Sequence, residues 1–145
     1  MVHEIRPARR EDMPFIGECV RRFRLDNEAL DADQFITVRQ GGEIIAFGRI
    51  KPYGEGIYEL GCVGVIEGQR GRGLGRLVVQ ELIERFPTDA VYVTTDLAKY
   101  FEKLGFIRTD ALPRPLAEKI QTVCDKLRSG VVGMVYQRQR SRTAR

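Results

Sequence analysis

The chain has 145 residues, of which 43% are hydrophobic and 30% charged, which is the composition of an ordinary globular domain. No run of about eighteen apolar residues occurs, so we expect no membrane-spanning helix, and the first residues lack the apolar core of a signal peptide. The net charge of +4 is carried entirely by four arginines, Arg138, Arg140, Arg142 and Arg145. We therefore predict a domain over residues 1–137 and a flexible basic tail over residues 138–145.

The basic tail could alternatively be an arm for an acidic partner. It contains no aromatic residue that could stack on a base, so nucleic-acid binding is not expected. The three cysteines, Cys19, Cys62 and Cys124, are far apart and odd in number, which favours a reducing, cytoplasmic compartment over a disulfide framework. His3 is the single histidine, and no metal-ligand spacing occurs, so no metal is expected.

The first half of the chain predicts a strand, a helix and three further strands. The first strand covers residues 2–6, and apolar residues at steps of three and four predict a helix over residues 10–23. Pro14 fits the first helical turn, so the helix proper should begin near Asp12. Residues 24–33 are polar and broken. The three strands are expected at residues 34–39, 43–51 and 57–66, with a Gly41-Gly42 hairpin turn between the first two.

The second half alternates helices and strands. A glycine-rich turn leads into a helix ending near Phe86, and residues 90–95, uncharged and rich in β-branched side chains, predict a buried central strand. Gly105 should end a short helix that begins at Leu97. The remaining elements are expected at residues 106–108 (extended), 116–127 (helix) and 130–137 (strand). This order predicts an α/β protein with a mixed sheet and helices on its faces.

The turn before the second long helix is the strongest functional signal. It reads Arg70-Gly71-Arg72-Gly73-Leu74-Gly75-Arg76 between a strand and a helix. The N-terminus of a helix has unpaired N–H groups and partial positive charge, which suit a phosphate, and glycines allow the backbone to approach it closely. The turn lacks the Gly-Lys-Ser/Thr ending of a P-loop, and its glycine spacing and mid-chain position differ from those of a dinucleotide-binding fingerprint.

These residues resemble the GNAT superfamily of acetyl-CoA-dependent N-acetyltransferases. The family signature Q/R-x-x-G-x-G/A matches Arg70-x-x-Gly73-x-Gly75, and a second, looser motif matches residues 98–106, which end in Gly105-Phe106. The resemblance covers residues 1–137. It implies a mostly antiparallel central sheet of six to seven strands with a splay between strands four and five, and acetyl-CoA as co-substrate.

The resemblance also implies the residues of the donor site. The pantetheine arm would pair with the backbone of Cys62, Val63 and Val65, and the pyrophosphate would lie on the turn. Phe101 would lie beside the cofactor. The turn residues concerned are Arg70, Gly71, Arg72, Gly73, Leu74, Gly75 and Arg76. Gly61 and Gly64 fit either a bulge in the fourth strand or tight packing.

Acetyl transfer to an amine requires a base, because an ammonium is not a nucleophile. Glu59, just before the expected splay, is the candidate, with an exposed strand residue or a salt bridge as the alternative role. Many family members place a tyrosine acid where this chain has Phe101, and Tyr100 is the neighbouring candidate, about 100° around the helix. Cys62 could suggest an acyl-enzyme, but no histidine other than His3 exists to activate it.

A narrower similarity points to the acetyltransferase domain of N-acetylglutamate synthases. It rests on Val93-Thr94-Thr95, on Tyr100-Phe101 and on the Leu112-Pro113 segment after the Gly-Phe pair. It implies a small amino acid such as glutamate as acceptor, with cations for its carboxylates, for which Arg24 and Arg49 are candidates. A protein, peptide or other small-amine acceptor, a non-catalytic acetyl-CoA-binding module and a homodimer remain open.

Overall fold

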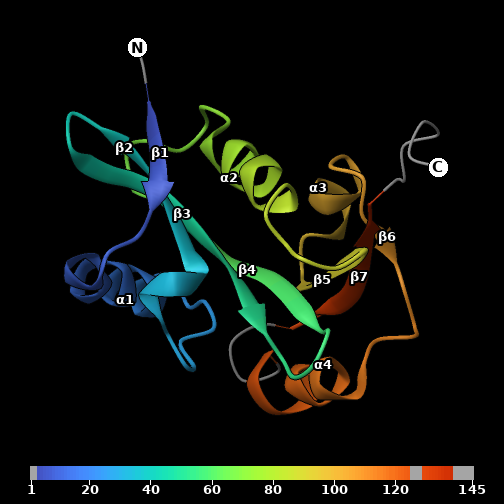
Figure 1. The fold of residues 1–145 in the computed structure, drawn as a ribbon. Helices are drawn as coiled ribbons and strands as arrows, with labels where there is room; N and C mark the ends of the chain where they lie inside the picture. Colours follow the sequence, from blue (N-terminus) through green and yellow to red (C-terminus); the bar gives the residue numbers. More distant parts are fainter. Residues whose placement is uncertain (1–2, 125–128, 139–145) are drawn as a thin grey trace, which may run out of the picture. The chain divides into compact units, whose positions relative to one another are not determined.

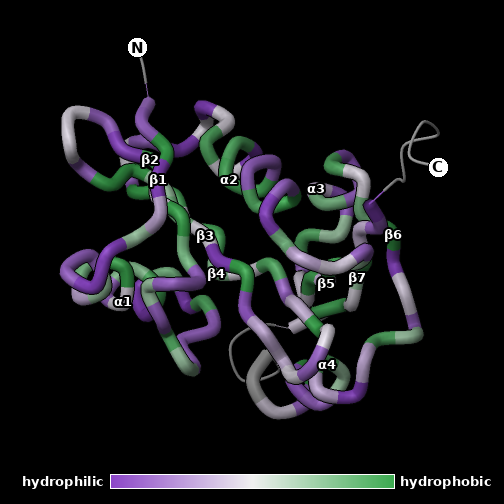
Figure 2. Tube along the Cα trace, viewed as in Figure 1, coloured by the Kyte–Doolittle hydropathy of each residue, from purple (hydrophilic) through white to green (hydrophobic). Residues whose placement is uncertain are grey.

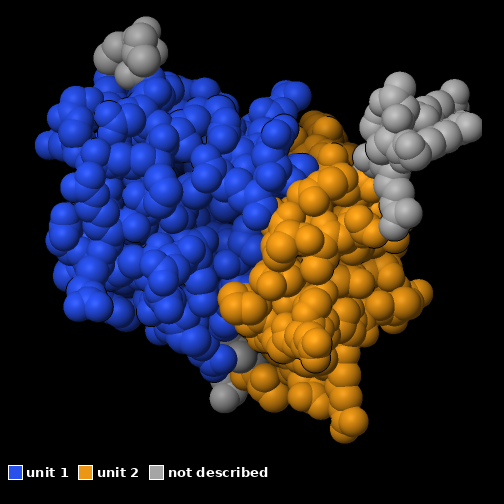
Figure 3. All heavy atoms as spheres, viewed as in Figure 1, with its two compact units in different colours: residues 1–51, 60–85 blue, residues 52–59, 86–145 orange. Residues whose placement is uncertain are grey.

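The computed structural model describes residues 3–124 and 129–138 (Figure 1). Its strands follow the order β1-β2-β3-β4-β5-β7-β6 in a seven-stranded sheet. Two compact units divide the chain, one comprising residues 1–51 and 60–85, the other residues 52–59 and 86–145 (Figure 3). Strand β4 (Tyr58–Val65) contributes its first two residues to the second unit and the others to the first.

The first unit contains three further strands and two long helices. The strands are β1 (Glu4–Pro7), β2 (Phe35–Gln40) and β3 (Glu43–Pro52). Strand β2 pairs antiparallel with both β1 and β3. A 3-10 turn, Arg10–Asp12, leads into α1 (Met13–Arg22), and a second one, Ala32–Gln34, precedes β2. The expected hairpin turn is confirmed, because Gly41 and Gly42 both have positive φ and Gln40 pairs with Glu43.

The helices of this unit cover opposite faces of its sheet. Side chains of α1 pack with Phe47 of β3 in one core cluster. A Cβ atom placed on the next residue, Gly48, would meet Val78 and Leu82 of α2 (Leu74–Ile83). Because successive residues of a strand point to opposite faces, α1 and α2 lie on different sides, as expected. Figure 2 shows hydrophobic and hydrophilic segments alternating along α2, which is the pattern of a helix with one buried face.

The second unit is built on an antiparallel strand pair. Strand β5 (Ala90–Thr95) pairs with β7 (Val132–Gln137), and β7 pairs on its other side with β6 (Ile107–Arg108). Helix α3 (Ala98–Glu102) precedes β6, and α4 (Arg114–Lys119) follows it and continues into a π-helical turn, Ile120–Cys124. On one face of β7, Tyr136 packs against Phe86 and Phe106, and on the other face Gly133 lies against Leu112.

Strands β4 and β5 form the parallel pair of the sheet. Their register consists of one residue pair, Glu59 opposite Tyr92. A splay between these strands requires their pairing to stop near the start of β4. The single residue pair lies there, at the second residue of β4. The mixed, mostly antiparallel sheet that the sequence predicts is confirmed.

Two sequence expectations need correction. Residues 90–95 are not buried on both faces, because Val91, Val93 and Thr95 are buried while the alternate residues are half-buried. The helix expected from residue 116 begins at Arg114, with Pro113 as N-cap and Pro115 in the first turn, and its α-helical part ends at Lys119. Residues 125–127 of that predicted helix lie outside the described residues.

Arg138, the first residue of the predicted tail, has contacts in the second unit. Arg138 donates hydrogen bonds to the carbonyls of Phe86 (2.8 Å) and Thr88 (3.3 Å), and its guanidinium lies 4.0 Å from the centroid of the Phe86 ring. It is therefore part of the folded chain. Residues 139–145 lie outside the described residues. None of the helices in the described part of the chain has the length and apolar character needed to span a bilayer.

Candidate active site

The glycine-rich turn joins β4 to α2 within the first unit. Gly73 is the N-cap of α2 with φ of 76°, and Gly71 has φ of 81°. No atom would lie within 4 Å of a Cβ at either position. The first backbone hydrogen bond of the helix runs from the Leu77 N–H to the Gly73 carbonyl (3.0 Å). The N–H groups of residues 74–76 precede that bond and have no partner inside the helix. The turn thus presents an exposed backbone with N–H groups at a helix start.

Arginines surround this turn. Arg70 Nε donates to the Val65 carbonyl (3.0 Å), and its guanidinium stacks 4.8 Å from the centroid of Phe23. Arg72 donates to Gln69 Oε1 (3.2 Å), and Arg76 is exposed in the first turn of α2. The turn therefore carries three positive charges, and Arg70 also holds the backbone of the turn against the end of β4.

An ion pair anchors the same turn to the end of α1. Arg22 donates to both carboxylate oxygens of Glu67, at 3.0 and 3.1 Å, and its guanidinium lies 5.1 Å from the Phe23 ring centroid. The hydrogen bonds from Arg22 lower the pKa of Glu67 below its ordinary value. Phe23 thus has arginines from two segments of the first unit, Arg22 and Arg70, in contact with its ring.

Strand β4 has an irregular backbone at Cys62. This residue has φ of 48°, a left-handed conformation that is uncommon for a residue with a side chain. Its thiol is buried and donates to the Asp26 carbonyl (2.9 Å). Gly64 allows close packing, because a Cβ there would lie 2.5 Å from the Phe47 ring. The distortion expected in β4 therefore lies at Cys62, between the two glycines, while Gly64 has the packing role that was the alternative. Val63 and Val65 are half-buried.

Glu59, the candidate base, lies in a buried ionic cluster of the second unit. Lys119 Nζ is 2.6 Å from both Glu59 carboxylate oxygens, and Thr94 Oγ1 donates to Oε2 at 2.6 Å. Glu59 is 2% exposed and Lys119 is 7% exposed. Thr94 lies two residues beyond Tyr92, the residue opposite Glu59, and so projects to the same face of β5. The salt bridge considered as the alternative role of Glu59 is present.

Sequence patterns did not indicate that Lys119 or Thr94 contacts Glu59. Lys119 is separated from Glu59 by 60 residues, and no spacing rule connects a lysine on a late helix to an acid on a middle strand. The sequence offered one indirect indication. Glu59 stands between apolar residues in a strand, and a carboxylate that is buried there requires a partner. That signal predicts a cation without naming it.

Tyr100 and Phe101 point to different environments. The Phe101 ring is buried and packs edge-to-face with Phe106 at a centroid distance of 5.3 Å. Tyr100 is 37% exposed and touches the edge of Phe101. The expectation that Tyr100 projects away from the position of Phe101 on α3 agrees with this difference in burial.

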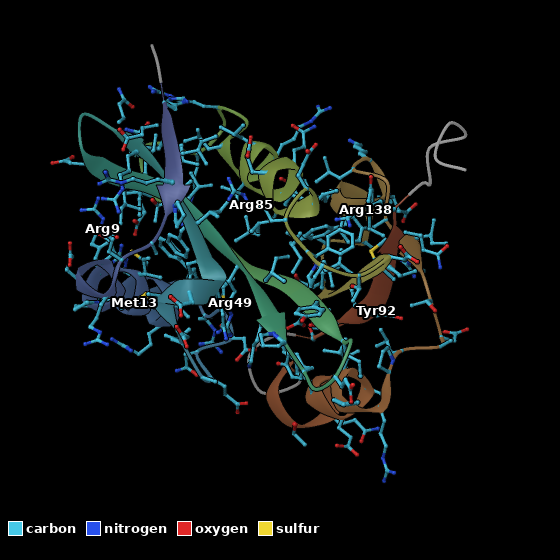
Figure 4. The ribbon with its side chains drawn as sticks, viewed as in Figure 1. Arg9, Met13, Arg49, Arg85, Tyr92 and Arg138 are labelled. Atoms are coloured by element: carbon cyan, nitrogen blue, oxygen red, sulfur yellow. The ribbon has the colours of Figure 1, made fainter. Side chains whose placement is uncertain are left out.

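Arg49, a candidate for the acceptor site, has a full set of hydrogen-bond partners within the first unit. Arg49, labelled in Figure 4, is 1% exposed and donates to the carbonyls of Asp26, Glu28 and Ala29 and to Gln34 Oε1, at 3.1 to 3.3 Å. These bonds use all four terminal N–H groups of the guanidinium. Arg49 is a structural cation that fixes the segment between α1 and β2. Arg24, in that segment, is exposed and has φ of 58°.

Metal ligation has no candidate in the described ranges, where no group of three or more histidine, cysteine or acidic side chains could hold an ion. Cys19 and Cys62 are both buried and unoxidised. Burial raises the pKa of the Cys19 thiol above its ordinary value, against the opposing effect of nearby Arg22. The side chain of Cys124 is outside the described part.

Several solved structures share this fold. The chain is similar to N-acetylglutamate synthase from Neisseria gonorrhoeae in complex with coenzyme A and N-acetyl-glutamate, with a TM-score of 0.79 and 16% identity over 97% of this chain and 36% of that one. It spans about a third of that protein's length. Rv2747 from Mycobacterium tuberculosis, in complex with CoA and NLQ, matches with a TM-score of 0.75 and 18% identity over 94% of this chain and 99% of that chain.

A third similar structure is yncA from Salmonella typhimurium, a putative acetyltransferase with its cofactor acetyl-CoA. Its TM-score is 0.70, with 16% identity over 100% of this chain and 99% of that one. At these identities the three structures show a shared fold. The sequence itself matches the model of the acetyltransferase (GNAT) family over residues 2–106, which is most of the chain. The chain belongs to the GNAT family of acetyltransferases, enzymes that use acetyl-CoA as the acetyl donor.

Proposed function

We propose that this enzyme transfers the acetyl group of acetyl-CoA to the α-amino group of a small, glutamate-like amino acid, by direct attack in a ternary complex. The observation that carries the acceptor class is the similarity to a synthase whose structure holds CoA together with N-acetyl-glutamate. Its match covers nearly the whole of the present chain.

The glycine-rich turn fits the donor. Left-handed glycines with open space above them, N–H groups at the start of α2 and three arginines form a site for a pyrophosphate. We assign it to the residues Arg70, Gly71, Arg72, Gly73, Leu74, Gly75 and Arg76. The backbone of Cys62, Val63 and Val65 is proposed to pair with the pantetheine arm, with the buried Phe101 ring beside the cofactor.

The chemistry needs a proton acceptor for the ammonium. Glu59 is the proposed base, and the nitrogen lone pair then attacks the thioester carbon while the C–S bond breaks. A backbone N–H of β4 is proposed to stabilise the oxyanion. The sulfur leaves as a thiolate whose thiol has an ordinary pKa near about 8.5, so a general acid is not essential. Tyr100 is the candidate if one takes part.

The donor half is tested on Arg76. We expect Arg76→Gln to raise the Kd of acetyl-CoA about tenfold, since a hydrogen bond or ion pair to a phosphate is worth roughly 1.5 kcal/mol. Arg85→Gln is the matched control, because Arg85 follows the same helix at its other end and pairs with Glu81. Equal acetyl-CoA affinity in Arg76→Gln and the parent enzyme would remove Arg76 from the donor site.

The acceptor half is tested by CoA release across a panel of amino acids, basic peptides and simple amines. We expect turnover with glutamate or a related small amino acid. Turnover with peptides alone would favour a protein substrate. Thermal stabilisation by acetyl-CoA without turnover on any amine would favour a binding module. Either result would reject the amino-acid assignment. A cytoplasmic location and a homodimer are part of the same proposal, on the cysteine content and on the family resemblance.

A further inference from the structure

Phe23, the residue that ends α1, takes no part in the proposed chemistry but contacts the glycine-rich turn. The guanidinium of Arg70 lies 4.8 Å from the centroid of its ring, and that of Arg22 lies 5.1 Å from it. The ring is also parallel, within 4°, to that of the fully buried Phe47, at a centroid distance of 6.5 Å. Phe23 therefore connects the turn to the core of the first unit.

The turn is held to the rest of this unit at two points. At Arg70, the side chain donates through Nε to the carbonyl of Val65, the last residue of β4, while its guanidinium stacks on Phe23. At Glu67, three residues earlier, the carboxylate accepts two hydrogen bonds from Arg22, at 3.0 and 3.1 Å. Phe23, Arg22, Glu67 and Arg70 together are called the clasp below.

The backbone of the turn needs such support. Gly71 and Gly73 both have positive φ, and no atom lies within 4 Å of a Cβ placed on either of them, so no side-chain packing restrains them. Glycine also has the largest backbone freedom of any residue. A segment that becomes ordered only on binding lowers the affinity by the free energy of ordering, whereas a segment already held in the bound shape does not. The clasp supplies this order before the ligand arrives.

We propose that Phe23 is a positioning residue for acetyl-CoA, which holds Arg70 and thereby fixes the glycine-rich turn in the shape that receives the pyrophosphate. The Arg22–Glu67 pair assists by fixing the start of the turn. Phe23 acts through Arg70 and touches no phosphate, so its effect is on the affinity for the donor and not on the transfer step. This inference rests on the proposed function, in which the turn binds the pyrophosphate.

The first test removes the ring without changing any charge. In Phe23→Leu we expect the Kd of acetyl-CoA, measured by isothermal titration, to rise about two- to fivefold, the factor that one exposed cation–π contact is worth. Phe23→Tyr keeps an aromatic face for both cations and should retain the parent Kd. In both variants kcat and the KM for the amino acid, measured at saturating acetyl-CoA, should stay at the parent values. Phe15→Leu, the same substitution at an exposed position of α1, is the control and should leave the Kd unchanged.

The second test separates positioning from simple electrostatics. Removing the acidic charge of Glu67 beside the turn favours an anionic ligand by Coulomb attraction alone, so on that basis Glu67→Gln would lower the Kd of acetyl-CoA. The clasp predicts the opposite, a higher Kd, because Arg22 loses the carboxylate that ties it to the turn. Glu84→Gln removes the same charge at the far end of α2, where salt screens it from the turn, and should leave the Kd unchanged.

A double-variant cycle assigns the effect of Phe23 to Arg70. Arg70→Gln alone should raise the Kd, and Phe23→Leu added to it should raise the Kd little further, because both changes remove the same contact. Losses that multiply independently would overturn the inference. A structural role alone would lower the Tm and kcat of Phe23→Leu at an unchanged Kd, and that result would overturn it too.

The exposed Glu67→Gln variant keeps the inference testable if Phe23→Leu does not fold, as judged by thermal unfolding, and a lowered Kd in Glu67→Gln rejects the clasp. Failure of the proposed function gives a different result. If Arg76→Gln and Gly73→Ala both bind acetyl-CoA as tightly as the parent, the turn is not the pyrophosphate site, whatever the Phe23 variants show.

Discussion

At the scale of single residues, the fold depends on buried charges. Arg49 joins β3 to the segment after α1 through four hydrogen bonds and an ion pair with Asp26, which Lys51 also contacts at 3.5 Å. Removing one partner of a buried pair leaves the other charge uncompensated. We expect Arg49→Met to lower the free energy of unfolding by about 3–5 kcal/mol, measured by urea unfolding.

The same variant tests the assignment of Arg49 to the acceptor site. If Arg49 bound a substrate carboxylate, Arg49→Met would raise the KM for an amino acid without a comparable loss of stability. The structure predicts the reverse, a large loss of stability and no selective effect on acidic acceptors. Arg21→Gln, at an exposed arginine of α1, is the control and should stay within about 0.5 kcal/mol of the parent.

At the scale of elements, α1 ends in a Schellman motif. The Leu25 N–H bonds to the Val20 carbonyl (2.9 Å) and the Arg24 N–H to the Arg21 carbonyl (3.1 Å), with Arg24 in the left-handed conformation. The left-handed conformation is energetically unfavourable for a residue with a Cβ, so Arg24→Gly should stabilise the protein by about 1 kcal/mol. Thermal unfolding measures this gain, and an unchanged or lower Tm would contradict it.

Arg24→Gly has a second readout in acetylation kinetics. The sequence assigns Arg24 to the acceptor carboxylates, and this prediction is independent of the cap. If it holds, the stabilised variant shows a higher KM for glutamate. If Arg24 acts through the cap alone, KM is unchanged while stability rises.

At the start of α2 the left-handed residue is a glycine, unlike Arg24 at the end of α1. Gly73 is already glycine, with open space around it, so Gly73→Ala costs backbone energy of about 1–2 kcal/mol without a clash. Its methyl group would project where we place the pyrophosphate. We expect a larger loss in acetyl-CoA affinity than in stability, measured by titration and by thermal unfolding. Gly42→Ala, in the distant hairpin turn, has the same backbone cost and should leave affinity unchanged.

Local chemistry explains which elements were predictable. A glycine affects the backbone conformation of only the few residues around it. The strand and helix boundaries predicted next to Gly41-Gly42, the glycine-rich turn and Gly105 agree with the structure within a few residues. Contacts between side chains and groups far away in the sequence were not predictable. A charged residue in a strand, such as Arg49, has the sequence pattern of an exposed side chain. Its burial depends on carbonyls of a segment that adopts its shape only in the folded chain.

At the scale of the whole molecule, acid should destabilise the fold through identified carboxyls. Burial would raise the pKa of Asp12, but hydrogen bonds from Arg39 and from the Arg9 N–H outweigh it, and the pKa lies below the ordinary 3.8. The pKa of Glu67 is likewise lowered, from 4.5, by Arg22. The unfolded chain therefore binds more protons at acidic pH. The stabilisation from both groups is complete above their unfolded pKa values and is lost as pH falls through the folded ones.

We expect the free energy of unfolding to decline as pH falls from about 5 to 3, measured by urea unfolding at each pH. Asp12→Asn should flatten part of this decline and also lower stability at pH 7 by about 3–5 kcal/mol, because buried Arg39 loses the carboxylate that lies 2.6 Å from it. Arg22→Gln should remove the smaller Glu67 part with little loss of stability, since that pair is exposed to solvent and weakened by salt. If Asp12→Asn kept the full acid slope of the parent, the decline would have to arise from carboxyls other than Asp12, and the Asp12–Arg39 pair would have no part in the acid sensitivity of the fold.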